Sequence, residues 1–148
     1  MKAIVQRVSN CEVYVRSCLR SKISTGLLAY VGFSRIDTHK DLEFVARKIL
    51  SLRIFRGVNG RLERSIKDAG GEIMIVSQFT IYGNTKRGTR PSFSASASYG
   101  VAEPLYYAFL NLFNEVGGLK VETGEFGEDM SIMSTNDGPI NLIIDSSG

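Results

Sequence analysis

Two segments of the chain hold side chains whose types and spacing could carry out chemistry. The first is Ser77-Gln78-Phe79-Thr80, in which three hydrogen-bonding side chains surround one aromatic ring. It is followed by a glycine-containing loop with three cations, Lys86, Arg87 and Arg90. Polar groups at a strand tip beside a basic loop favour a pocket for a phosphate-bearing substrate. The alternative is a strand end whose hydroxyls satisfy local backbone groups, followed by a solvated turn.

The second segment is Asn136-Asp137-Gly138-Pro139, which lies between two apolar stretches. On its own this composition is typical of a turn. A cis Gly-Pro bond would fix backbone carbonyls in an unusual direction, although cis is the minority form of an X-Pro bond. Neither segment by itself decides a function.

Other residue types that commonly carry out catalysis or bind metals and cofactors are scarce. The one histidine, His39, falls on the polar first turn of a predicted helix, so a Ser-His-Asp triad lacks its base. Cys11 and Cys18 are expected to be small buried hydrophobes, and the acidic turn at 125–129 is expected to face solvent. No Walker loop or dinucleotide-binding glycine motif is present. We therefore expect no metal and no cofactor, and catalysis by backbone donors, hydroxyls or the substrate itself.

The elements that would position these segments follow from the apolar pattern. A β-branched run at 73–76 predicts a buried strand with residues 77–80 at its tip. A capping pair, Thr38 and Asp41, starts a helix with an apolar stripe through residue 52, and a second helix is predicted at 101–116 with Pro104 in its first turn. Further strands are predicted at 2–15, 19–23, 26–33, 52–55 and 61–63 (around Asn59-Gly60), 119–122, 130–134 and 140–145.

About eight strands and two helices predict one α/β domain over residues 1–148, built as packed sheets or a partly open barrel. The net charge of +3 permits a nucleic-acid partner without demanding one. No apolar run approaches the ~20 residues that span a bilayer, and Arg7 interrupts the apolar N-terminus, so no signal peptide is predicted. We expect a cytoplasmic protein.

Seven motifs decide among these options. They are Ala3-Ile4-Val5-Gln6-Arg7-Val8, Ala46-Arg47-Lys48-Ile49-Leu50 with Leu52-Arg53-Ile54-Phe55, Val76-Ser77-Gln78-Phe79-Thr80, Arg90-Pro91-Ser92-Phe93, Ala102-Glu103-Pro104-Leu105-Tyr106, Val121-Glu122-Thr123-Gly124 and Asn136-Asp137-Gly138-Pro139. In this order and spacing they resemble the D-aminoacyl-tRNA deacylase family over essentially the whole chain. The chain departs from the family pattern at Asn141, where a threonine is usual, and at the Ser17–Lys22 turn, which lacks the customary glycines.

The resemblance implies a homodimer that hydrolyses the ester between a D-amino acid and the 3′-terminal adenosine of tRNA. Ser77 would line the aminoacyl pocket with the catalytic segment Gln78, Phe79 and Thr80. Gly138-Pro139, cis in the family, would reach into the other subunit's pocket and leave no room for an L side chain.

Three further roles are expected. Arg7 would fix the Gly-Pro segment, and Met130 would pack near the adenine. Lys86, Arg87 and Arg90 are candidates for contacting acceptor-stem phosphates. Because glycine has no side chain to exclude, glycyl-tRNA, including glycine mischarged on alanine tRNA, is an expected secondary substrate.

Several alternatives stay open at the level of the sequence. Catalysis by backbone N–H groups with help from the terminal ribose 2′-hydroxyl is favoured over a covalent Thr80 nucleophile, because nothing nearby could serve as its base. The chain could instead be a non-catalytic module that binds tRNA ends, a hydrolase of another ester, or a relative of relaxed chirality with a trans Gly-Pro bond.

Overall fold

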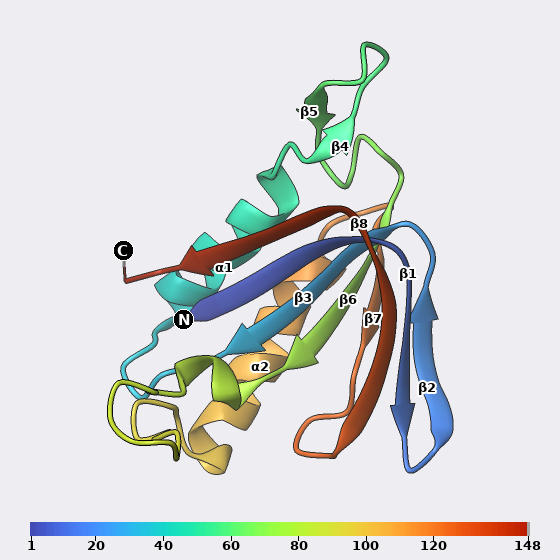
Figure 1. Ribbon diagram of the computed structural model, residues 1–148. Coiled ribbons are helices and arrows are strands. Elements are labelled where there is room, and N and C mark those ends of the chain that lie inside the picture. Colours follow the sequence, from blue (N-terminus) through green and yellow to red (C-terminus); the bar gives the residue numbers. More distant parts are fainter. Residues whose placement is uncertain (148) are drawn as a thin grey trace.

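A strongly curved β-sheet organises the chain, and both helices lie on one side of it (Figure 1). The computed structural model describes residues 1–147. In chain order the elements are β1 (Lys2–Val15), β2 (Cys18–Ile23), β3 (Gly26–Gly32), α1 (His39–Ser51), β4 (Phe55–Arg56), β5 (Leu62–Arg64), β6 (Glu72–Ser77), the 3₁₀ helix η1 (Phe79–Tyr82), α2 (Tyr99–Asn114), β7 (Lys120–Thr123) and β8 (Met130–Asp145).

The curvature originates in β1, which is long enough to pair with three strands. Its first half pairs with β3 and its second half with β2, while β8 runs antiparallel along β1 from end to end. Strands β3, β6 and β7 continue the sheet as parallel neighbours. The sheet then curls until β2 meets β7, where the Ser21 hydroxyl donates to the Thr123 carbonyl at 2.7 Å. The result is a nearly closed, barrel-shaped sheet, which is the second of the two arrangements, packed sheets or a partly open barrel, that the sequence predicts.

Both faces of the central strands are covered, which explains their continuous apolar sequences. One face packs against α1 and α2 through residues such as Leu27, Ile73 and Ile75. The other face lines the inside of the curved sheet, where Leu28, Met74 and Val76 are buried with residues of β1 and β2. A fully buried side chain of this kind contributes roughly 1.5–3 kcal/mol. The strands that end at the candidate site are therefore held from both sides.

The predictions with local signals are confirmed. Helix α1 begins after Thr38, whose N–H donates to the Asp41 carboxylate at 2.8 Å, and its apolar stripe is buried. The Asn59-Gly60 hairpin forms between β4 and β5 and projects from the rest of the chain (Figure 1). None of the helices in the 1–147 range is long and apolar enough to cross a membrane.

Other ends are shifted by one to three residues, such as β4 at Phe55–Arg56 where a strand is predicted at 52–55, and three predictions need a larger correction. Strand β6 pairs with β3 as far as Ser77, two residues beyond its last pair with β7 at Ile75, and the chain then turns into η1. Helix α2 begins at Tyr99, so Pro104 is its sixth residue instead of part of its first turn.

The third correction concerns residues 130–145, which form one strand, β8, instead of two strands joined by a turn. Val8 pairs with Asn136 and Gln6 pairs with Asn141, so residues 137–140 bulge opposite the single residue Arg7. Continuous pairing with β1 keeps the strand intact on both sides of this bulge.

Candidate active site

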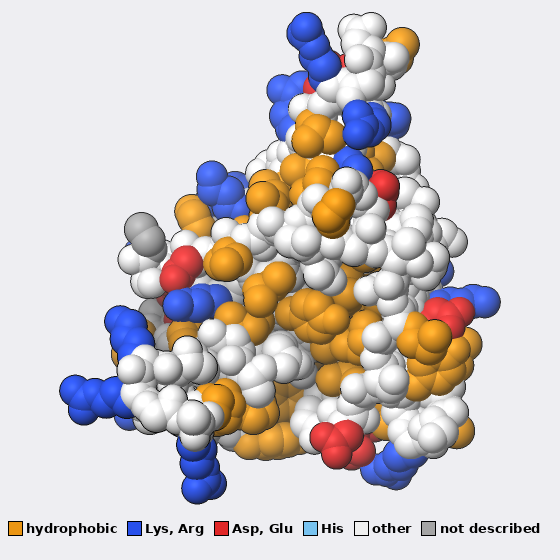
Figure 2. Space-filling view, in the orientation of Figure 1, with side chains coloured by type: hydrophobic (Ala, Val, Ile, Leu, Met, Phe, Trp, Pro, Cys, Tyr) orange, Lys and Arg blue, Asp and Glu red, His pale blue; other side chains and the backbone are white. Residues whose placement is uncertain are grey.

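A hollow of about 580 Å³ lies where β3 and β6 end. Hydrophobic side chains gather in the hollowed centre of the face that Figure 2 shows. The hollow is lined by Val31, Gly32, Phe33, Ser77, Gln78, Phe79, Thr80, Ser96, Ala97, Tyr99, Ala102, Phe126, Gly127, Glu128, Asp129, Met130 and Ile132. The structure thus brings together the whole predicted segment 77–80 and Met130.

In the described chain, the turn after β6 leaves two backbone donors free beside this hollow. The Gln78 N–H still bonds to the sheet, donating to the Val31 carbonyl at 2.7 Å. The next two N–H groups, of Phe79 and Thr80, open η1 and have no acceptor within residues 1–147. The first N–H groups of a helix lack intrahelical partners. Two free donors at adjacent positions can stabilise a developing oxyanion.

The side chains of this turn leave Thr80 without a base. The Gln78 amide donates to the Thr80 hydroxyl oxygen, which is the one hydrogen-bond partner that the described residues give this hydroxyl. An amide cannot accept the proton that a nucleophilic hydroxyl must lose. The Phe79 ring is half exposed and packs edge-on against Phe93, with ring centroids 5.2 Å apart.

The opposite wall comes from α2 and the β7–β8 loop. The Tyr99 and Phe126 rings meet edge-on with centroids 5.1 Å apart. Partial desolvation and the nearby Glu103 carboxylate raise the pKa of the Tyr99 phenol. Sequence reasoning missed both rings; an aromatic residue within an acidic turn expected to face solvent was the available signal for Phe126.

Met130 is placed by a close approach to the loop before it. Its sulfur accepts the Glu125 N–H at 3.4 Å and lies over Gly124, where a Cβ would be only 2.6 Å from the sulfur. Gly124 therefore leaves the space that Met130 occupies. The Glu128 carboxylate of the same loop pairs with Arg16 at 3.0 Å.

The Gly138-Pro139 segment lies away from the hollow, in the bulge of β8. Neither residue lines it, and neither does Arg7. The peptide bond between them is cis, and Gly138 has a φ of +118°, a backbone conformation that L side chains rarely adopt. A Cβ on Gly138 would lie 3.1 Å from Arg7 Nη2, so the bulge is packed directly on that guanidinium.

Arg7 is buried and joins three parts of the chain. Its Nη1 donates to the Ile54 carbonyl at 2.5 Å, and its Nε lies 2.9 Å from an Asp137 carboxylate oxygen. The Nε–H is not directed at that oxygen, so this contact is an ion pair without a hydrogen bond. The Asn136 amide donates to the Arg7 carbonyl at 2.9 Å and to the Ile140 carbonyl at 3.3 Å.

The three predicted phosphate contacts, Lys86, Arg87 and Arg90, are exposed on the loop that follows η1. This loop is closed by a bridge between Asn84 and Ser92, and its Phe93 packs on Phe79. Phe93 therefore joins this loop to the wall of the hollow, and the three cations do not line it.

Comparison with known proteins identifies this arrangement. The sequence profile of the family described as D-Tyr-tRNA(Tyr) deacylase matches residues 4–145. The chain belongs to this deacylase family. It is 48% identical to a D-aminoacyl-tRNA deacylase of Parabacteroides distasonis over 149 residues, covering 99% of this chain and 97% of that relative. It is 46% identical to a D-aminoacyl-tRNA deacylase of Chlorobaculum parvum over 146 residues, covering 99% and 98%.

Two solved structures are similar to this deacylase-family chain. One, described as c-Myc DNA Unwinding Element Binding Protein, has a TM-score of 0.92, is 36% identical and covers 98% of each chain. The other, described as a probable eukaryotic D-amino acid tRNA deacylase, has a TM-score of 0.82 and covers 97% of each chain. At 16% identity the second likeness shows the fold alone.

The two departures from the deacylase pattern have structural counterparts. Asn141 accepts a hydrogen bond from the Gln6 amide at 2.8 Å, while the bulge is braced by Arg7 and Asn136. In the β1–β2 turn, Arg16 and Ser17 have φ values of 49° and 64°, which glycine adopts most easily.

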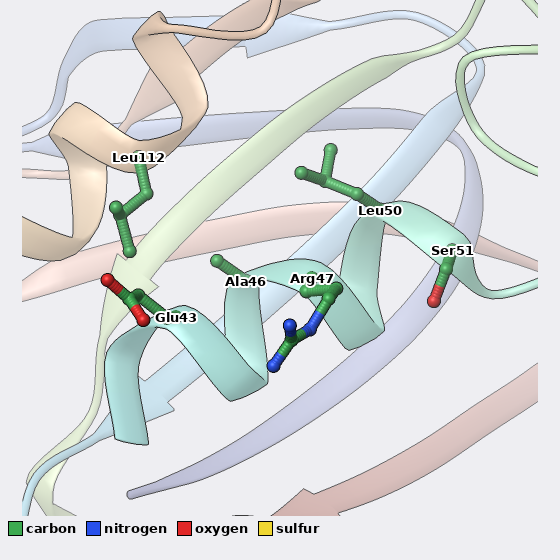
Figure 3. A pocket seen from close by; sticks show the side chains of 6 residues that line it. All are labelled: Glu43, Ala46, Arg47, Leu50, Ser51 and Leu112. Atoms are coloured by element: carbon green, nitrogen blue, oxygen red, sulfur yellow. The ribbon is translucent and has the colours of Figure 1, made fainter. Parts of the chain in front are cut away.

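A second hollow, of about 470 Å³, lies between the helices of this deacylase-family chain (Figure 3). It is lined by Glu43, Ala46, Arg47, Leu50 and Ser51 of α1 and by Leu112 of α2. It contains none of the predicted site residues. Within residues 1–147 no group of three or more His, Cys, Asp or Glu side chains could hold a metal ion, and His39 is an exposed residue 3.3 Å from Glu43.

Proposed function

We propose that this chain hydrolyses the ester bond of D-aminoacyl-tRNA and releases the free D-amino acid and tRNA. Similarity to D-aminoacyl-tRNA deacylases over 99% of the chain supports the activity and the substrate class. The observation that carries the proposal is the pair of free N–H groups, of Phe79 and Thr80, beside a hollow of about 580 Å³. This volume lies in the range of small-molecule sites. We propose the cytoplasm as the location of this activity, because aminoacylated tRNA is used there.

The chemistry asks little of the protein because an aminoacyl ester is already activated. A water adds to the carbonyl carbon, the Phe79 and Thr80 N–H groups stabilise the oxyanion, and the ester C–O bond then breaks. The ribose oxygen leaves with a proton that the attacking water has lost. A single oxyanion donor typically contributes ~2.7–4 kcal/mol to the barrier. The adjacent ribose 2′-hydroxyl would relay the proton, since no protein base contacts Thr80 and the two carboxylates that line the hollow, Glu128 and Asp129, belong to the β7–β8 loop instead of the donor turn.

In this route the Thr80 hydroxyl forms no bond to the substrate and only helps to position the turn. The alternative is that the Thr80 hydroxyl attacks the ester as a covalent nucleophile. The Thr80→Ala variant separates the two. In the RNA-assisted route it keeps most of the turnover, because the Thr80 N–H remains. Near-abolished turnover with intact fold and tRNA affinity would overturn this route, and a covalent adduct in mass spectrometry would establish the nucleophile.

We further propose that the active form is a homodimer in which Gly138-Pro139 of one subunit completes the other's pocket. Strand β8 supports this, because β1 is its only partner within the described chain and its outer edge is open along 16 residues. Such an edge is a template for pairing with another chain. Met133 and Ile143 on this strand are 61% and 77% exposed, which is high for apolar side chains. Gly138 and Pro139 lie on the same strand, away from their own hollow.

Chirality would then be set by exclusion. Backbone carbonyls of the inserted Gly138-Pro139 segment would occupy the space of an L side chain, while a D side chain points into the hollow. Met130 would pack near the adenine, and Lys86, Arg87 and Arg90 would contact acceptor-stem phosphates. Glycyl-tRNA is a secondary substrate in this scheme because it has no side chain to exclude.

One assay tests the function. D-tyrosyl, L-tyrosyl and glycyl esters, each on its cognate tRNA, are incubated with the protein and the remaining ester is measured over time. We expect hydrolysis of the D and glycyl esters and survival of the L ester. Binding of the tRNA without loss of the D ester would instead identify a non-catalytic module. Equal hydrolysis of D and L esters would identify a deacylase of relaxed chirality.

A further inference from the structure

The β4–β5 hairpin has a net positive charge as large as that of the whole chain. The basic hairpin, defined as residues 53–68, has five cations and two carboxylates, so its net charge of +3 equals that of the whole chain. All five cations, Arg53, Arg56, Arg61, Arg64 and Lys67, are exposed. Figure 2 shows Lys and Arg side chains gathered on this projection.

The charges of the basic hairpin are left uncompensated by the rest of the protein. None of the five cations forms an ion pair in the described structure. Arg53 and Arg56 donate to backbone carbonyls, of Glu63 at 2.7 Å and Gly60 at 2.8 Å. The Asp68 carboxylate accepts from the Ser65 N–H and hydroxyl instead of pairing with a cation. An exposed, unpaired basic projection fits a polyanion.

The basic hairpin lies at the wrong end of the sheet to serve its own hollow. Strand β6 starts just after the hairpin and ends at the hollow, and its six residues extend about 20 Å. The bulge at 137–140 is at the hairpin's end of the sheet. Buried Arg7 joins the two, contacting the Ile54 carbonyl of the hairpin at 2.5 Å and Asp137 of the bulge at 2.9 Å.

We infer that the basic hairpin of one subunit binds the phosphate backbone of the tRNA whose aminoacylated end lies in the other subunit's pocket. This inference rests on the proposed function and the proposed dimer. If Gly138-Pro139 enters the partner's pocket, the start of the hairpin must lie close to that pocket too, because Arg7 contacts both Ile54 of the hairpin and Asp137 of the bulge. Five cations then stand beside the mouth through which the acceptor end of the tRNA must pass.

A charge-neutralised variant tests the contact. Arg56→Gln, Arg61→Gln and Lys67→Gln are combined, and the matched control removes three exposed cations from α1 (Lys40→Gln, Arg47→Gln, Lys48→Gln). Hydrolysis is measured on D-tyrosyl-tRNA and on 3′-O-D-tyrosyl-adenosine, which lacks the rest of the tRNA.

We expect the hairpin variant to lose at least tenfold in kcat/KM on D-tyrosyl-tRNA near 0.15 M salt. For this variant, the slope of log kcat/KM against the logarithm of the salt concentration should become less negative by about two to three, which is close to one for each lost phosphate contact. Hydrolysis of the adenosine ester should stay at the wild-type rate, and the control should behave as wild type on both esters. An unchanged salt slope in the hairpin variant, or an equal change in the control, overturns the inference.

The outcome is separable from failure of the proposed function. If the wild type hydrolyses neither ester, the function fails, and the hairpin is still tested by the salt dependence of uncharged-tRNA binding. Arg61→Glu alone provides a second variant, for which we expect weaker tRNA binding than wild type. Unchanged binding by this folded variant contradicts the inference.

Mixed dimers test which pocket the hairpin serves. A hairpin-neutralised subunit is paired with a subunit whose hollow is filled by Ala102→Phe, so that the one open pocket faces the one intact hairpin. We expect wild-type kcat/KM per open pocket on D-tyrosyl-tRNA. A mixed dimer as slow as the hairpin variant, or a chain that is monomeric in light scattering, overturns the assignment to the partner's pocket.

Discussion

Replacement of Arg7 by methionine should destabilise the fold by about 2 kcal/mol, mainly by removing one hydrogen bond. The Arg7 side chain is 3% exposed, and its charged Nη1 donates to the Ile54 carbonyl at 2.5 Å. Hydrogen bonds to charged groups contribute ~1.5–3 kcal/mol, and a buried acceptor left unpaired adds to the loss. Methionine preserves most of the apolar volume, so a cavity adds little.

The ion pair with Asp137 should contribute much less. The Asp137 side chain is 51% exposed, and the Arg7 Nε–H is not directed at its carboxylate. Exposed pairs are typically worth ~0–1 kcal/mol. Asp137→Asn is therefore the matched control, with an expected cost below about 1 kcal/mol.

Chemical denaturation of the two variants and the wild type measures both values, and the melting temperature of Arg7→Met should fall by roughly 4–8 °C. Asp137→Asn as costly as Arg7→Met would show that the ion pair dominates. A neutral or stabilising Arg7→Met would show that burying the guanidinium costs as much as its hydrogen bond returns. Either result refutes the reasoning.

If the proposed dimer is correct, Arg7→Met should also weaken discrimination against the L ester, because Gly138 packs on this guanidinium.

Three further predictions concern stability and reactivity. Ser17→Gly should raise the free energy of unfolding by about 1 kcal/mol, because Ser17 has a φ of 64°; no gain in denaturation would show that this backbone carries no strain. Asp41→Ala should cost about 1 kcal/mol at pH 7. Its Thr38 N–H hydrogen bond lowers the pKa of the Asp41 carboxyl to about 2, so the stabilisation is complete above the ordinary pKa and disappears as pH falls through about 2; a pH-independent difference would contradict it. Cys11 is buried as predicted, whereas the prediction that Cys18 is buried was wrong, because it lies exposed at the start of β2. A thiol reagent at pH 8 should therefore label Cys18 in the native protein and Cys11 only after unfolding, since burial raises the pKa of Cys11 to about 11; two labelled native thiols would refute this.

The sequence predicts well the features whose causes are local. The Thr38 and Asp41 cap lies within four residues, and Asn59-Gly60 determines its own hairpin. The buried central strand at residues 26–32 is recognisable because both of its faces are covered, which leaves an apolar run without alternation. Such signals need no knowledge of which strand lies beside which.

The wrong predictions depend on distant partners. Strand β6 pairs with β7 as far as Ile75 and with β3 as far as Ser77, and residues 77–80 do not encode where these neighbouring strands end. The 136–139 segment has the composition of a turn, yet β1 pairs with residues on both sides and makes it a bulge. The Tyr99 and Phe126 wall is likewise assembled from an α2 residue and a loop residue far apart in the sequence. The roles proposed for the site residues remain predictions.

The placement of the two chemical segments within one rigid sheet explains why a second copy is needed in the proposed mechanism. The hollow is built where β3 and β6 end, whereas the Gly138 bulge is anchored by Arg7 where β6 begins. Strands β1 and β8 pair on both sides of the bulge, which holds the bulge at its own end of the sheet. A group that is fixed at the far end of a sheet acts on a pocket only if that pocket belongs to another molecule. Damage to the bulge should therefore appear in the partner's pocket, and a mixed dimer should retain one selective and one unselective site.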